Sequence, residues 1–571
     1  MNHLYYGDNL TVLRDSIADE SVDLIYLDPP FNSNANYNVL FRSPTGDQSA
    51  AQIEAFTDTW HWGEDAEDAF QQVRRSGHTD VATMLEAMRS FLGTNDMMAY
   101  LTMMAVRLIE LHRVLKPTGS LYLHCDPTAS HYLKILLDAV FGKEAFKNEI
   151  IWRRTGAHNH ANRYGPIHDT ILFFAKTRHY RHNAVFTPYL KGHVDAYFKR
   201  SDSKGRYWTN SLHGAGTRNG ESGRIWRGYD PTAVGRHWAV PGELVLELGI
   251  DPDLPQHRKL DLLADAGVID FPEPGSRALP TYRQYLQGSV GQLLQDIWAF
   301  QPHTNGVLNG TSVGVDEDVR WISPRDKIER LGYPTQKPVG LLERIIAASS
   351  NPGDVVLDPF CGCGTTIHAA EKLGRQWIGI DVTHLAVGLI ERRIREAFPT
   401  AQFKVHGTPQ DLAAAQDWFD RDDPTKKEFE KWAVSLIGAQ PWRAGKKGAD
   451  GGIDGRLSFG KTGVALVSVK GGRDRQRNHI DQLNHVVTRE KADIGVFLTL
   501  HPPTKPMLAE AAGAGQFTVE GFDPVPRIQI VTIEDAMRQR ERAVRIPLAR
   551  DDAFRKPARE EDQTRQSKLD L

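Results

Sequence analysis

The sequence predicts an α/β protein with a mostly parallel sheet covered by helices, followed by a smaller α/β domain. Three observations predict it. The apolar run Val22–Leu27 reads as a buried strand and ends at Asp28. Strand and helix patterns alternate before residue 185 and again after residue 333, as in a parallel sheet. A glycine-rich loop at 358–364 follows a second apolar run, 354–357. Ligands bind at the carboxyl ends of strands in such sheets, so the chemistry is expected there.

The composition sets limits on the class of protein. A chain of 571 residues exceeds one hydrophobic core, which indicates several domains. Apolar residues make up 40% and charged residues 25%, which is typical of a globular protein. Three cysteines exclude a disulfide framework. No secretory leader or apolar run of 18 residues is present, so we expect a cytoplasmic protein without a membrane partner.

The first predicted domain, 1–184, contains a helical insertion at 42–98. Its expected elements are a strand ending at Tyr5–Asn9, helix 10–17, strand 22–27, helix 99–115, turn 116–119, strand 120–124, helix 128–141, and strands 150–152 and 170–174.

The middle region, 185–325, loses this alternation and is rich in Gly, Pro, Arg, His and Trp. Residues 151–240 hold 15 Lys/Arg and 5 Asp/Glu, a local charge of +10 in a chain of net charge −3. Interleaved basic and aromatic residues suit phosphate contacts and base stacking. The DNA-binding candidates are Arg153, Arg154, Arg224, Trp226, Arg227, Arg236 and Trp238. A solvated basic face or an irregular structural insertion would give a similar pattern.

The alternation returns in the third predicted segment, 326–412. It contains helix 338–350, strand 354–357, the loop 358–364, helix 365–373, strand 377–381 and a helix to about 397. Gly362 and Gly364 permit a tight turn and close approach of a ligand. Asp381 ends the next strand, where an acid can accept hydrogen bonds from ribose hydroxyls. The loop lacks both the third glycine of a dinucleotide fingerprint and the lysine of a phosphate loop. S-adenosylmethionine therefore fits better than NAD or ATP.

The tetrapeptide Asp28-Pro29-Pro30-Phe31 offers a carboxylate, a fixed backbone carbonyl and a stacking ring. These groups can hold a flipped-out base by its exocyclic amino group.

Both motifs, with Gly332–Pro338 before the second, resemble the amino-methylating DNA methyltransferases. The tetrapeptide precedes the cofactor loop, with an irregular segment between them. That order is similar to the circularly permuted β group and covers about residues 1–410. The resemblance implies a Rossmann-like S-adenosylmethionine-dependent fold with a loop-rich target-recognition region. It also implies a double-stranded DNA substrate and is compatible with a homodimer.

The resemblance also assigns roles to residues. Asp28 and the carbonyl of Pro29 would accept hydrogen bonds from the adenine N6 amino group, and Phe31 would stack on the base. An Asp at the first position favours adenine N6, with cytosine N4 as the alternative. The cofactor candidates are Asp358, Phe360, Gly362, Gly364, Thr365, Asp381, Lys337, and either Asp8 or Asp411 for the cofactor adenine. Direct transfer needs no covalent intermediate, so Cys361 and Cys363 are not expected to be nucleophiles, and methyl transfer needs no metal.

After a predicted charged linker at 413–425, residues 426–540 resemble the restriction-endonuclease-like fold of the Mrr group. Active nucleases of this fold gather an acid, a second acid or Gln, and a Lys around a divalent metal. Asp454 and Lys470 match, and Glu430 lies in the preceding helix, but Ser468 stands where Glu or Gln is expected. Serine is a poor metal ligand, so we expect a clamping, targeting or dimerising domain. The alternative is a fused restriction-modification enzyme, which would require Mg²⁺. Residues 541–571 are predicted to be a disordered tail.

Overall fold

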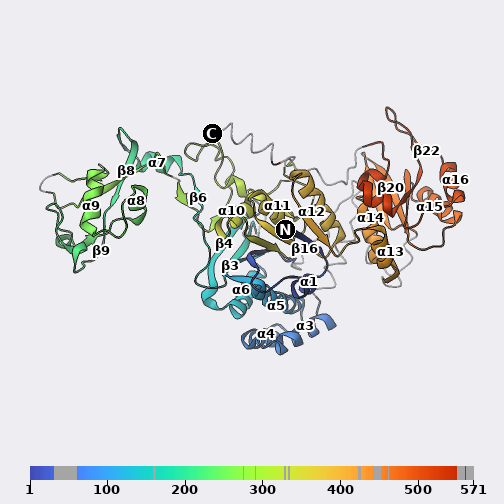
Figure 1. Cartoon of the computed structure of the whole chain (residues 1–571), viewed down its shortest axis with the longest axis horizontal. Coiled ribbons are helices and arrows are strands. Elements are labelled where there is room, and N and C mark those ends of the chain that lie inside the picture. Colours follow the sequence, from blue (N-terminus) through green and yellow to red (C-terminus); the bar gives the residue numbers. More distant parts are fainter. Residues whose placement is uncertain are drawn as a thin grey trace. The chain divides into compact units, whose positions relative to one another are not determined.

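The computed structural model describes residues 1–30, 61–157, 162–273, 276–289, 291–323, 325–326, 329–331, 333, 335–421, 426–442, 452–460, 462–548 and 560. Two compact units are present, and each is considered by itself (Figure 1). The first comprises Met1–Val185, Gln295–Phe300 and Asp318–Leu571, and the second comprises Phe186–Leu294 and Gln301–Glu317.

The first unit contains a nine-stranded sheet. Its strands are β1 (Asn2–Tyr6), β2 (Val22–Leu27), β3 (Leu115–Cys125), β4 (Phe146–Arg153), β5 (His168–Ala175), β14 (Ile297–Trp298), β15 (Val355–Asp358), β16 (Gln376–Asp381) and β17 (Phe403–His406). The order is β14-β4-β5-β3-β2-β15-β16-β1-β17. Among these described strands, only β5 runs antiparallel to its neighbours. The predicted mixed, mostly parallel sheet is confirmed.

Helices cover both faces of this sheet (Figure 1). One group is α1 (Asn9–Ser16), α3 (Glu64–Arg75), α4 (Thr79–Leu92), α5 (Asp96–Val114) and α6 (Ser130–Phe141), which share one hydrophobic cluster with the sheet. The other group is α10 (Val339–Ser349), α11 (Thr365–Lys372) and α12 (His384–Ala397). Strand β2 is buried at every position because it lies in the centre of the sheet with helices on both sides.

The structure corrects the predicted turn at 116–119. Strand β3 begins at Leu115, which pairs with Val22 of β2, and a register shift lies between Val22 and Leu24. Lys116 also binds Asp23 of β2, with 2.7 Å between Nζ and Oδ2. The Pro-Thr-Gly signal therefore marks an irregularity within the strand, not a break before it.

The second unit falls within the predicted region 185–325. A four-stranded antiparallel sheet contains β7 (Arg200–Asp202), β8 (Gly205–Ser211), β11 (Ile269–Asp270) and β12 (Thr281–Tyr285). Two-stranded sheets pair β9 (His213–Ala215) with β10 (Arg236–Trp238), and β6 (Phe186–Thr187) with β13 (Gln292–Leu293). The helices are α7 (Lys191–Tyr197), α8 (Gly242–Glu247) and α9 (Gln256–Asp265). The unit has its own apolar cluster, which includes Trp226 and Trp238.

The C-terminal part of the chain forms a five-stranded sheet of order β18-β19-β20-β21-β24. Its strands are β18 (Gln440–Pro441), β19 (Gly455–Phe459), β20 (Gly463–Lys470), β21 (Ile494–Thr499) and β24 (Ile528–Thr532). A short pair, β22 (Gln516–Phe517) and β23 (Val525–Pro526), lies apart from it. Its helices are α14 (Lys427–Leu436), α15 (Arg477–Arg489), α16 (Lys505–Gly513) and α17 (Ile533–Gln539). This is the smaller α/β domain that the sequence predicts.

Most of the stretch predicted as a linker, 413–425, is instead helix α13 (Leu412–Arg421). Ala415 of this helix is buried in the same apolar cluster as Phe429 and Trp432 of α14. Small and aromatic residues at helical spacing, 415, 418 and 419, give α13 an apolar face despite the charges around them. Residues 422–425 and most of the predicted tail lie outside the described residues.

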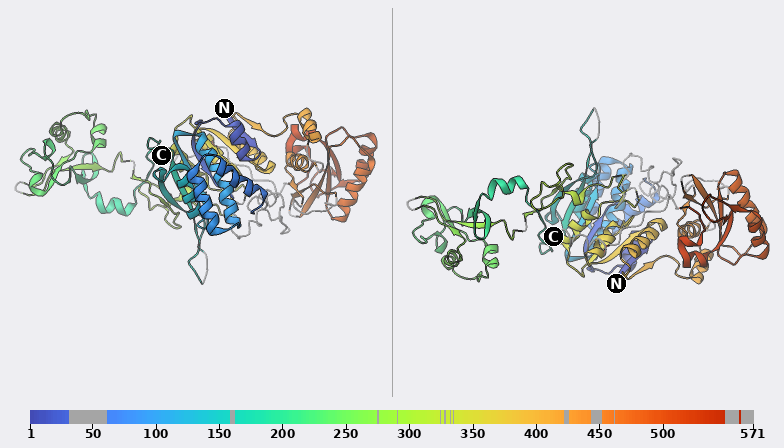
Figure 2. Two further views of the ribbon diagram at one scale, coloured as in Figure 1. Left: turned by 90° about the horizontal axis from the view of Figure 1, so that it is seen from below. Right: turned by 90° about the horizontal axis from the view of Figure 1, so that it is seen from above.

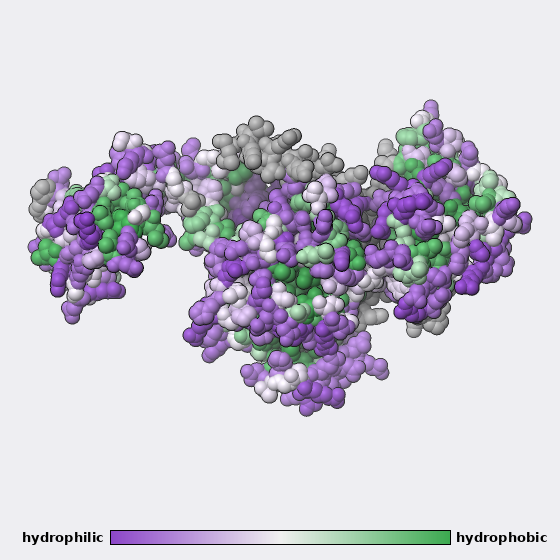
Figure 3. Space-filling model, viewed as in Figure 1, coloured by the Kyte–Doolittle hydropathy of each residue, from purple (hydrophilic) through white to green (hydrophobic). Residues whose placement is uncertain are grey.

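The face of the molecule in Figure 3 is largely hydrophilic, with apolar side chains in small separate patches. Figure 2 gives two further views of the same elements. Within the described ranges, no helix combines the length and apolar character needed to span a bilayer.

Candidate functional site

The two sequence motifs lie at the ends of neighbouring strands. Strands β2 and β15 pair in parallel, with Leu24 opposite Val356 and Ile25 opposite Leu357. Asp28 follows β2 and Asp358 ends β15, so both acids emerge at the same edge of the sheet. Some 330 residues of sequence separate the two acids, and they come together because β2 and β15 are neighbours in the sheet. This edge is the candidate active site.

Asp28 forms an ion pair with Lys337, which lies just before α10. The two side chains are 27% and 15% exposed, so a ligand at the sheet edge can still reach the carboxylate. Pro29 is buried and fixes the chain directly after the acid. The resemblance predicts Lys337 as a partner for the cofactor carboxylate, and the structure instead pairs it with Asp28. Phe31 lies outside the described residues.

The loop after β15 needs its glycines for both conformation and space. Gly362 and Gly364 have φ values of +49° and +73°, in the left-handed region. A Cβ on Gly364 would lie 2.7 Å from Cγ1 of Ile390 in α12. The backbone therefore turns closely into the start of α11, with Gly362 packed against the ring of Tyr333 and Gly364 against Ile390.

Both loop cysteines are buried, as expected for small packing residues in a turn. The thiol of Cys361 donates to the carbonyl of Ile380 at 3.2 Å. Burial raises the pKa of both thiols above the ordinary value. A buried thiol with a raised pKa is a poor nucleophile, which agrees with the prediction that neither cysteine reacts.

Asp358 is buried and turned into its own loop. Its Oδ2 accepts from the hydroxyl of Thr366 at 2.5 Å, and its Oδ1 accepts from the backbone N–H of Phe360 at 3.0 Å. Burial raises the pKa of Asp358 to about 7 despite these hydrogen bonds. This predicted cofactor residue therefore supports the shape of the loop from within. Phe360, at the turn, is half-buried.

Asp381 ends β16, the strand beside β15. Its Oδ2 accepts from the N–H of Gly362 at 2.9 Å, and its Oδ1 accepts from the N–H and hydroxyl of Thr383 at 2.9 and 2.8 Å. Burial raises its pKa to about 6 against the effect of these donors. The acid is thus tied to the glycine loop by these hydrogen bonds.

Asp8 and Asp411 are both candidates for the cofactor adenine, and their positions differ. Tyr6 pairs with Asp381 across β1 and β16, so Asp8 follows β1 at the same edge as Asp381. Asp8 caps α1 through the N–H of Thr11 and binds Arg107 with 2.8 Å between Oδ2 and Nη2. Asp411 lies beyond β17 and caps α13 through the N–H of Ala414. The geometry favours Asp8.

Arg107 and Asn9 were not found from the sequence. Nε of the buried Arg107 donates to Oδ1 of Asn9 at 2.6 Å, and Asn9 donates to the carbonyl of Pro359 at 2.9 Å. This chain of contacts links Asp8 to the cofactor loop. The Tyr-Gly-Asp-Asn sequence at 6–9 gives a signal for Asp8 alone.

Thr365 is less accessible than predicted. Its hydroxyl donates to the carbonyl of Lys337 at 3.3 Å and accepts from Nη1 of Arg393 at 3.2 Å. Arg393 is buried and also donates to the carbonyl of Cys363 at 3.0 Å. Thr365 therefore connects the Lys337 segment to the glycine loop, with its hydroxyl already engaged on both sides.

A buried polar chain lies beside Asp28 and was also missed. The phenol of Tyr26 and Nδ1 of His124 are 2.9 Å apart, and Nε2 of His124 is 3.1 Å from Oδ2 of Asp169. Burial alone would raise the pKa of Asp169, but His124, Lys337 and Arg154 together lower it. Strand β3 neighbours β2, so His124 lies next to the strand that carries Asp28.

The predicted DNA-binding tryptophans are the clearest error. Trp226 and Trp238 are buried in the core of the second unit, 4% and 1% exposed. Their indole N–H groups donate to Asp261 at 3.1 Å and to the carbonyl of Arg224 at 2.9 Å. Aromatic rings beside arginines fill the interior of this small unit and cannot stack on DNA without unfolding it.

The predicted DNA-binding arginines have varied surroundings. Arg224, Arg227 and Arg236 are exposed on the second unit, and Arg227 binds Asp261 at 3.1 Å. In the first unit, Arg153 donates to the carbonyl of Phe300 at 3.0 Å, and Arg154 binds Asp169 at 3.3 Å.

The nuclease-like residues all lie in the C-terminal domain, where Asp454 contacts strand β20. Oδ2 of Asp454 accepts from the N–H of Val469 at 2.6 Å and from the hydroxyl of Ser468 at 3.4 Å. Ser468 and Lys470 are two residues apart in β20, so their side chains lie on the same face of the strand. Ser468 contacts Asp454 from this face. Glu430 is half-buried on α14. Among the residues that the structure describes, no group of three or more His, Cys, Asp or Glu could hold a metal ion.

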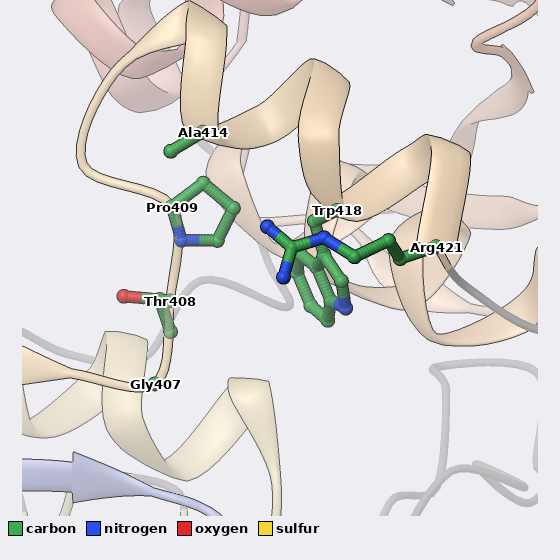
Figure 4. A pocket seen from close by; sticks show the side chains of 6 residues that line it. All are labelled: Gly407, Thr408, Pro409, Ala414, Trp418 and Arg421. Carbon is green, nitrogen blue, oxygen red and sulfur yellow. The ribbon is translucent and has the colours of Figure 1, made fainter.

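A pocket of about 270 Å³ lies at the end of β17. It is lined by Gly407, Thr408, Pro409, Ala414, Trp418 and Arg421, with the Arg421 guanidinium reaching toward Pro409 and Trp418 (Figure 4). None of its lining residues belongs to the two motifs, so this pocket is separate from the candidate active site.

Comparisons with known proteins show the family of the chain. A family model described as DNA methylase, covering N6 and N4 enzymes, matches residues 22–392, more than half of the chain. The chain therefore belongs to this DNA methylase family. A second model, described as restriction endonuclease, matches residues 422–523 and identifies the C-terminal domain.

The chain is similar to several characterised relatives. It is 32% identical to the type II methyltransferase M.EcaI of Enterobacter cloacae over 296 residues, 52% of this chain and 57% of the relative. It is 26% identical to the Mod subunit of the type III restriction-modification enzyme StyLTI of Salmonella typhimurium, covering 65% and 50%. The DNA adenine methyltransferase YhdJ of Escherichia coli is 48% identical over 77 residues, 13% of this chain and 26% of YhdJ. The chain thus spans about half the length of the first two relatives.

A solved structure of a DNA modification methylase from Thermus thermophilus, complexed with S-adenosylmethionine, matches 72% of this chain and 100% of its own. The identity is 16% and the TM-score is 0.32.

Proposed function

We propose that the chain is a site-specific DNA methyltransferase that transfers a methyl group from S-adenosylmethionine to the N6 amino group of adenine in duplex DNA. One observation carries the proposal: Asp28 and the glycine loop lie at the ends of adjacent parallel strands. A base held by Asp28 and a cofactor held by the loop would lie side by side. Membership of the DNA methylase family supports the reaction class.

The loop and its neighbours suit S-adenosylmethionine, which would supply an electrophilic methyl group on a sulfonium. The left-handed conformations of Gly362 and Gly364 give the tight turn at the end of β15 along which the cofactor would lie. Asp381 is buried at this edge, and ribose hydroxyls would donate to its carboxylate and stabilise its charge. Asp8 lies at the end of the next strand, where it would meet the adenine ring.

Asp28 would act on the target base. Its carboxylate and the carbonyl of Pro29 accept hydrogen bonds from the two N6 protons, which draws the nitrogen lone pair out of conjugation with the ring. The nitrogen then attacks the methyl carbon, the carbon–sulfur bond breaks, and one N6 proton leaves toward Asp28 or water. Positioning and electrostatics supply most of the rate in such a mechanism. Phe31 would stack on the flipped base.

Adenine is favoured over cytosine by the Asp at position 28, with the adenine methyltransferase YhdJ as a supporting relative. The exposed Arg224, Arg227 and Arg236 of the second unit would contact DNA phosphates. We infer that the C-terminal domain binds DNA without cutting it, because Ser468 replaces a metal ligand and already bonds to Asp454.

Mass spectrometry of nucleosides tests the proposal directly. Plasmid DNA is incubated with the protein and S-adenosylmethionine and then digested to nucleosides. We expect N6-methyladenine, at levels that fall to background with Asp28→Ala. N4-methylcytosine instead would retain the mechanism and overturn the choice of base. No methylated base, with the cofactor still bound, would overturn the proposed function.

A further inference from the structure

The described parts of the connection between β4 and β5, residues 154–157 and 162–167, form the two sides of an arm that projects from the sheet (Figure 2). It leaves β4 after Arg153 and returns to β5 at His168, and these two residues pair across the strands. Strand β5 runs against the others, so its start lies at the same edge as the ends of β2, β3 and β4. The arm therefore rises from the edge of the sheet that carries Asp28.

The root of the arm is held firmly. The guanidinium of Arg153 lies 5.1 Å from the ring centroid of Trp321, and Nη1 of Arg153 donates to the carbonyl of Phe300 at 3.0 Å. The N–H of Arg154 donates to the carbonyl of Ile167 at 3.0 Å, which closes the two sides of the arm. Contacts of this kind fix the direction in which the arm leaves the sheet.

The root is also linked to the catalytic edge. Nε of Arg154 lies 3.3 Å from Oδ1 of Asp169, and Asp169 contacts the His124 that bonds to Tyr26. Tyr26 lies two residues before Asp28 on β2. A continuous set of polar contacts thus joins the arm to the strand that presents Asp28.

Tyr164 lies on the returning side of the arm and is 99% exposed, the highest value among the large apolar or aromatic side chains that the structure describes. The described residues of the arm and its root include Arg153, Arg154, Arg163 and His168, and the sequence has no Asp or Glu between 153 and 168. An aromatic ring held in solvent by a basic arm has a surface that suits a stack of bases flanked by phosphates. Such a surface is poorly suited to packing in an apolar protein core.

We propose that Tyr164 inserts into the base stack of duplex DNA and occupies the space that the flipped adenine leaves. This inference rests on the proposed function, because only an enzyme that extrudes a base creates that space. Flipping breaks the stacking and pairing of the target base, which costs free energy. A ring that stacks on the exposed neighbours recovers part of this cost, and the nearby Arg163 holds a phosphate. Tyr164 would then act on the DNA from the edge that also presents Asp28.

The test compares two pairing states of the target. Once sequencing of methylated plasmid gives the recognition site, duplex oligonucleotides are made with the target adenine paired to thymine or placed opposite an abasic position. Rates are measured for the wild type, Tyr164→Ala, Tyr164→Phe and Phe91→Ala. Phe91 is a matched control because it is an aromatic residue 80% exposed on α4.

On the paired duplex, Tyr164→Ala should lower kcat/KM on the order of ten- to hundredfold, the range expected from loss of one aromatic ring stacked on a base. The abasic partner, which removes the cost of breaking the pair, should restore most of that loss. Tyr164→Phe and Phe91→Ala should resemble the wild type. With 2-aminopurine at the target position, Tyr164→Ala should show a smaller rise in fluorescence on binding.

Equal rates for Tyr164→Ala and the wild type on paired DNA would overturn the inference. An equal loss on both duplexes would also overturn it, since that pattern indicates a structural role. Absence of methylation by the wild type itself would instead overturn the proposed function, so the two failures are distinguishable.

Discussion

The carboxylate of Asp28 is paired with the ammonium of Lys337, 309 residues further along the chain. The backbone carbonyl of Lys337 also accepts a hydrogen bond from the hydroxyl of Thr365, the first residue of α11. Lys337 thus joins the acid that would hold the base to the loop that would hold the cofactor. This segment therefore contacts both halves of the candidate site.

Loss of the carboxylate at position 28 should stop the reaction without affecting cofactor binding. We expect Asp28→Asn to lower kcat on the order of 10²- to 10³-fold, as removal of one preorganised electrostatic group does. The Kd for S-adenosylmethionine, measured by calorimetry, should change little. Asp138→Asn, which alters a surface ion pair with Lys134, is the control and should leave both quantities unchanged. A normal kcat for Asp28→Asn would contradict the mechanism.

The pair itself can be tested by a double-mutant cycle. Lys337→Gln should lower kcat because Asp28 loses the cation that orients it. In the double variant, the two losses should not add, since each single change already disrupts the same contact. Single-turnover rates for the four proteins give the coupling. Strictly additive effects would show that the two residues act independently.

Cofactor affinity should depend on pH through Asp381. Burial raises its pKa to about 6, so the empty site favours the protonated acid below that pH. Ribose hydroxyls donate best to the ionised form, so binding should strengthen as the pH rises through about 6 and level off above 7. Below pH 6 the affinity should fall by up to about tenfold per pH unit. Calorimetric titrations from pH 5 to 8 measure this.

Asp381→Asn provides the control for that experiment, because an amide does not titrate. Its affinity should be weaker at pH 8 and nearly constant with pH. Asp358, whose pKa burial raises to about 7, faces into the loop and should influence stability instead. The folded protein holds its proton more tightly, so between about pH 4 and 7 Asp358 lowers the free energy of unfolding as pH rises. A pH-independent affinity in the wild type would exclude Asp381 from the cofactor site.

Substitution of Gly364 and of Gly388 by alanine should have opposite effects on stability. Gly364→Ala should destabilise the fold and weaken cofactor binding, since φ is +73° and the new Cβ would lie 2.7 Å from Ile390. Strain in such a position costs on the order of 1–3 kcal/mol. Gly388 lies within α12 with nothing within 4 Å of its Cβ position, so Gly388→Ala should stabilise the fold by about 1 kcal/mol. Thermal unfolding of both variants gives the comparison.

The elements that carry the two motifs could be predicted because each motif follows a short apolar strand. Asp28 ends one such run and Asp358 ends another, and parallel strands place their ends at one edge. Local sequence holds all of that information. The ion pair of Asp28 with Lys337 could not be predicted, because it depends on the order of strands in the sheet and not on spacing along the chain.

Burial of the aromatic residues in the second unit could not be predicted from the sequence. Trp226 and Trp238 each have a neighbouring arginine or histidine, a pattern that suits both a DNA-stacking surface and a small core. The second unit has few long apolar elements, so it uses indole rings to fill its interior. His124 and Asp169 gave no signal either, since a polar residue within a strand-like run is visible only once its neighbour strand is known.

The corrected view of the second unit leads to a prediction. Arg236→Ala and Arg224→Ala remove exposed charges, so each should reduce the dependence of DNA affinity on salt by about one phosphate contact, with no loss of stability. Trp238→Ala should instead destabilise the unit by about 3–5 kcal/mol, as loss of a buried tryptophan does. Binding titrations over a range of salt, with thermal unfolding in parallel, distinguish the two effects. If the Trp238→Ala protein is stable but binds DNA weakly, Trp238 contacts DNA and the buried role is wrong.

The C-terminal domain gives the last prediction. Ser468 occupies a position where a metal ligand is needed, and Oδ2 of Asp454 already accepts from Val469 and Ser468. We expect no Mg²⁺-dependent cutting of plasmid by the wild type and no detectable Mn²⁺ binding by calorimetry. Ser468→Glu would place a second carboxylate beside Asp454 and should create a Mn²⁺ site. Adding Asp454→Asn to that variant should remove the site again, which shows that both acids are ligands. Wild-type cleavage that Asp454→Asn abolishes would instead establish a fused restriction-modification enzyme, with Ser468 tolerated in an active centre.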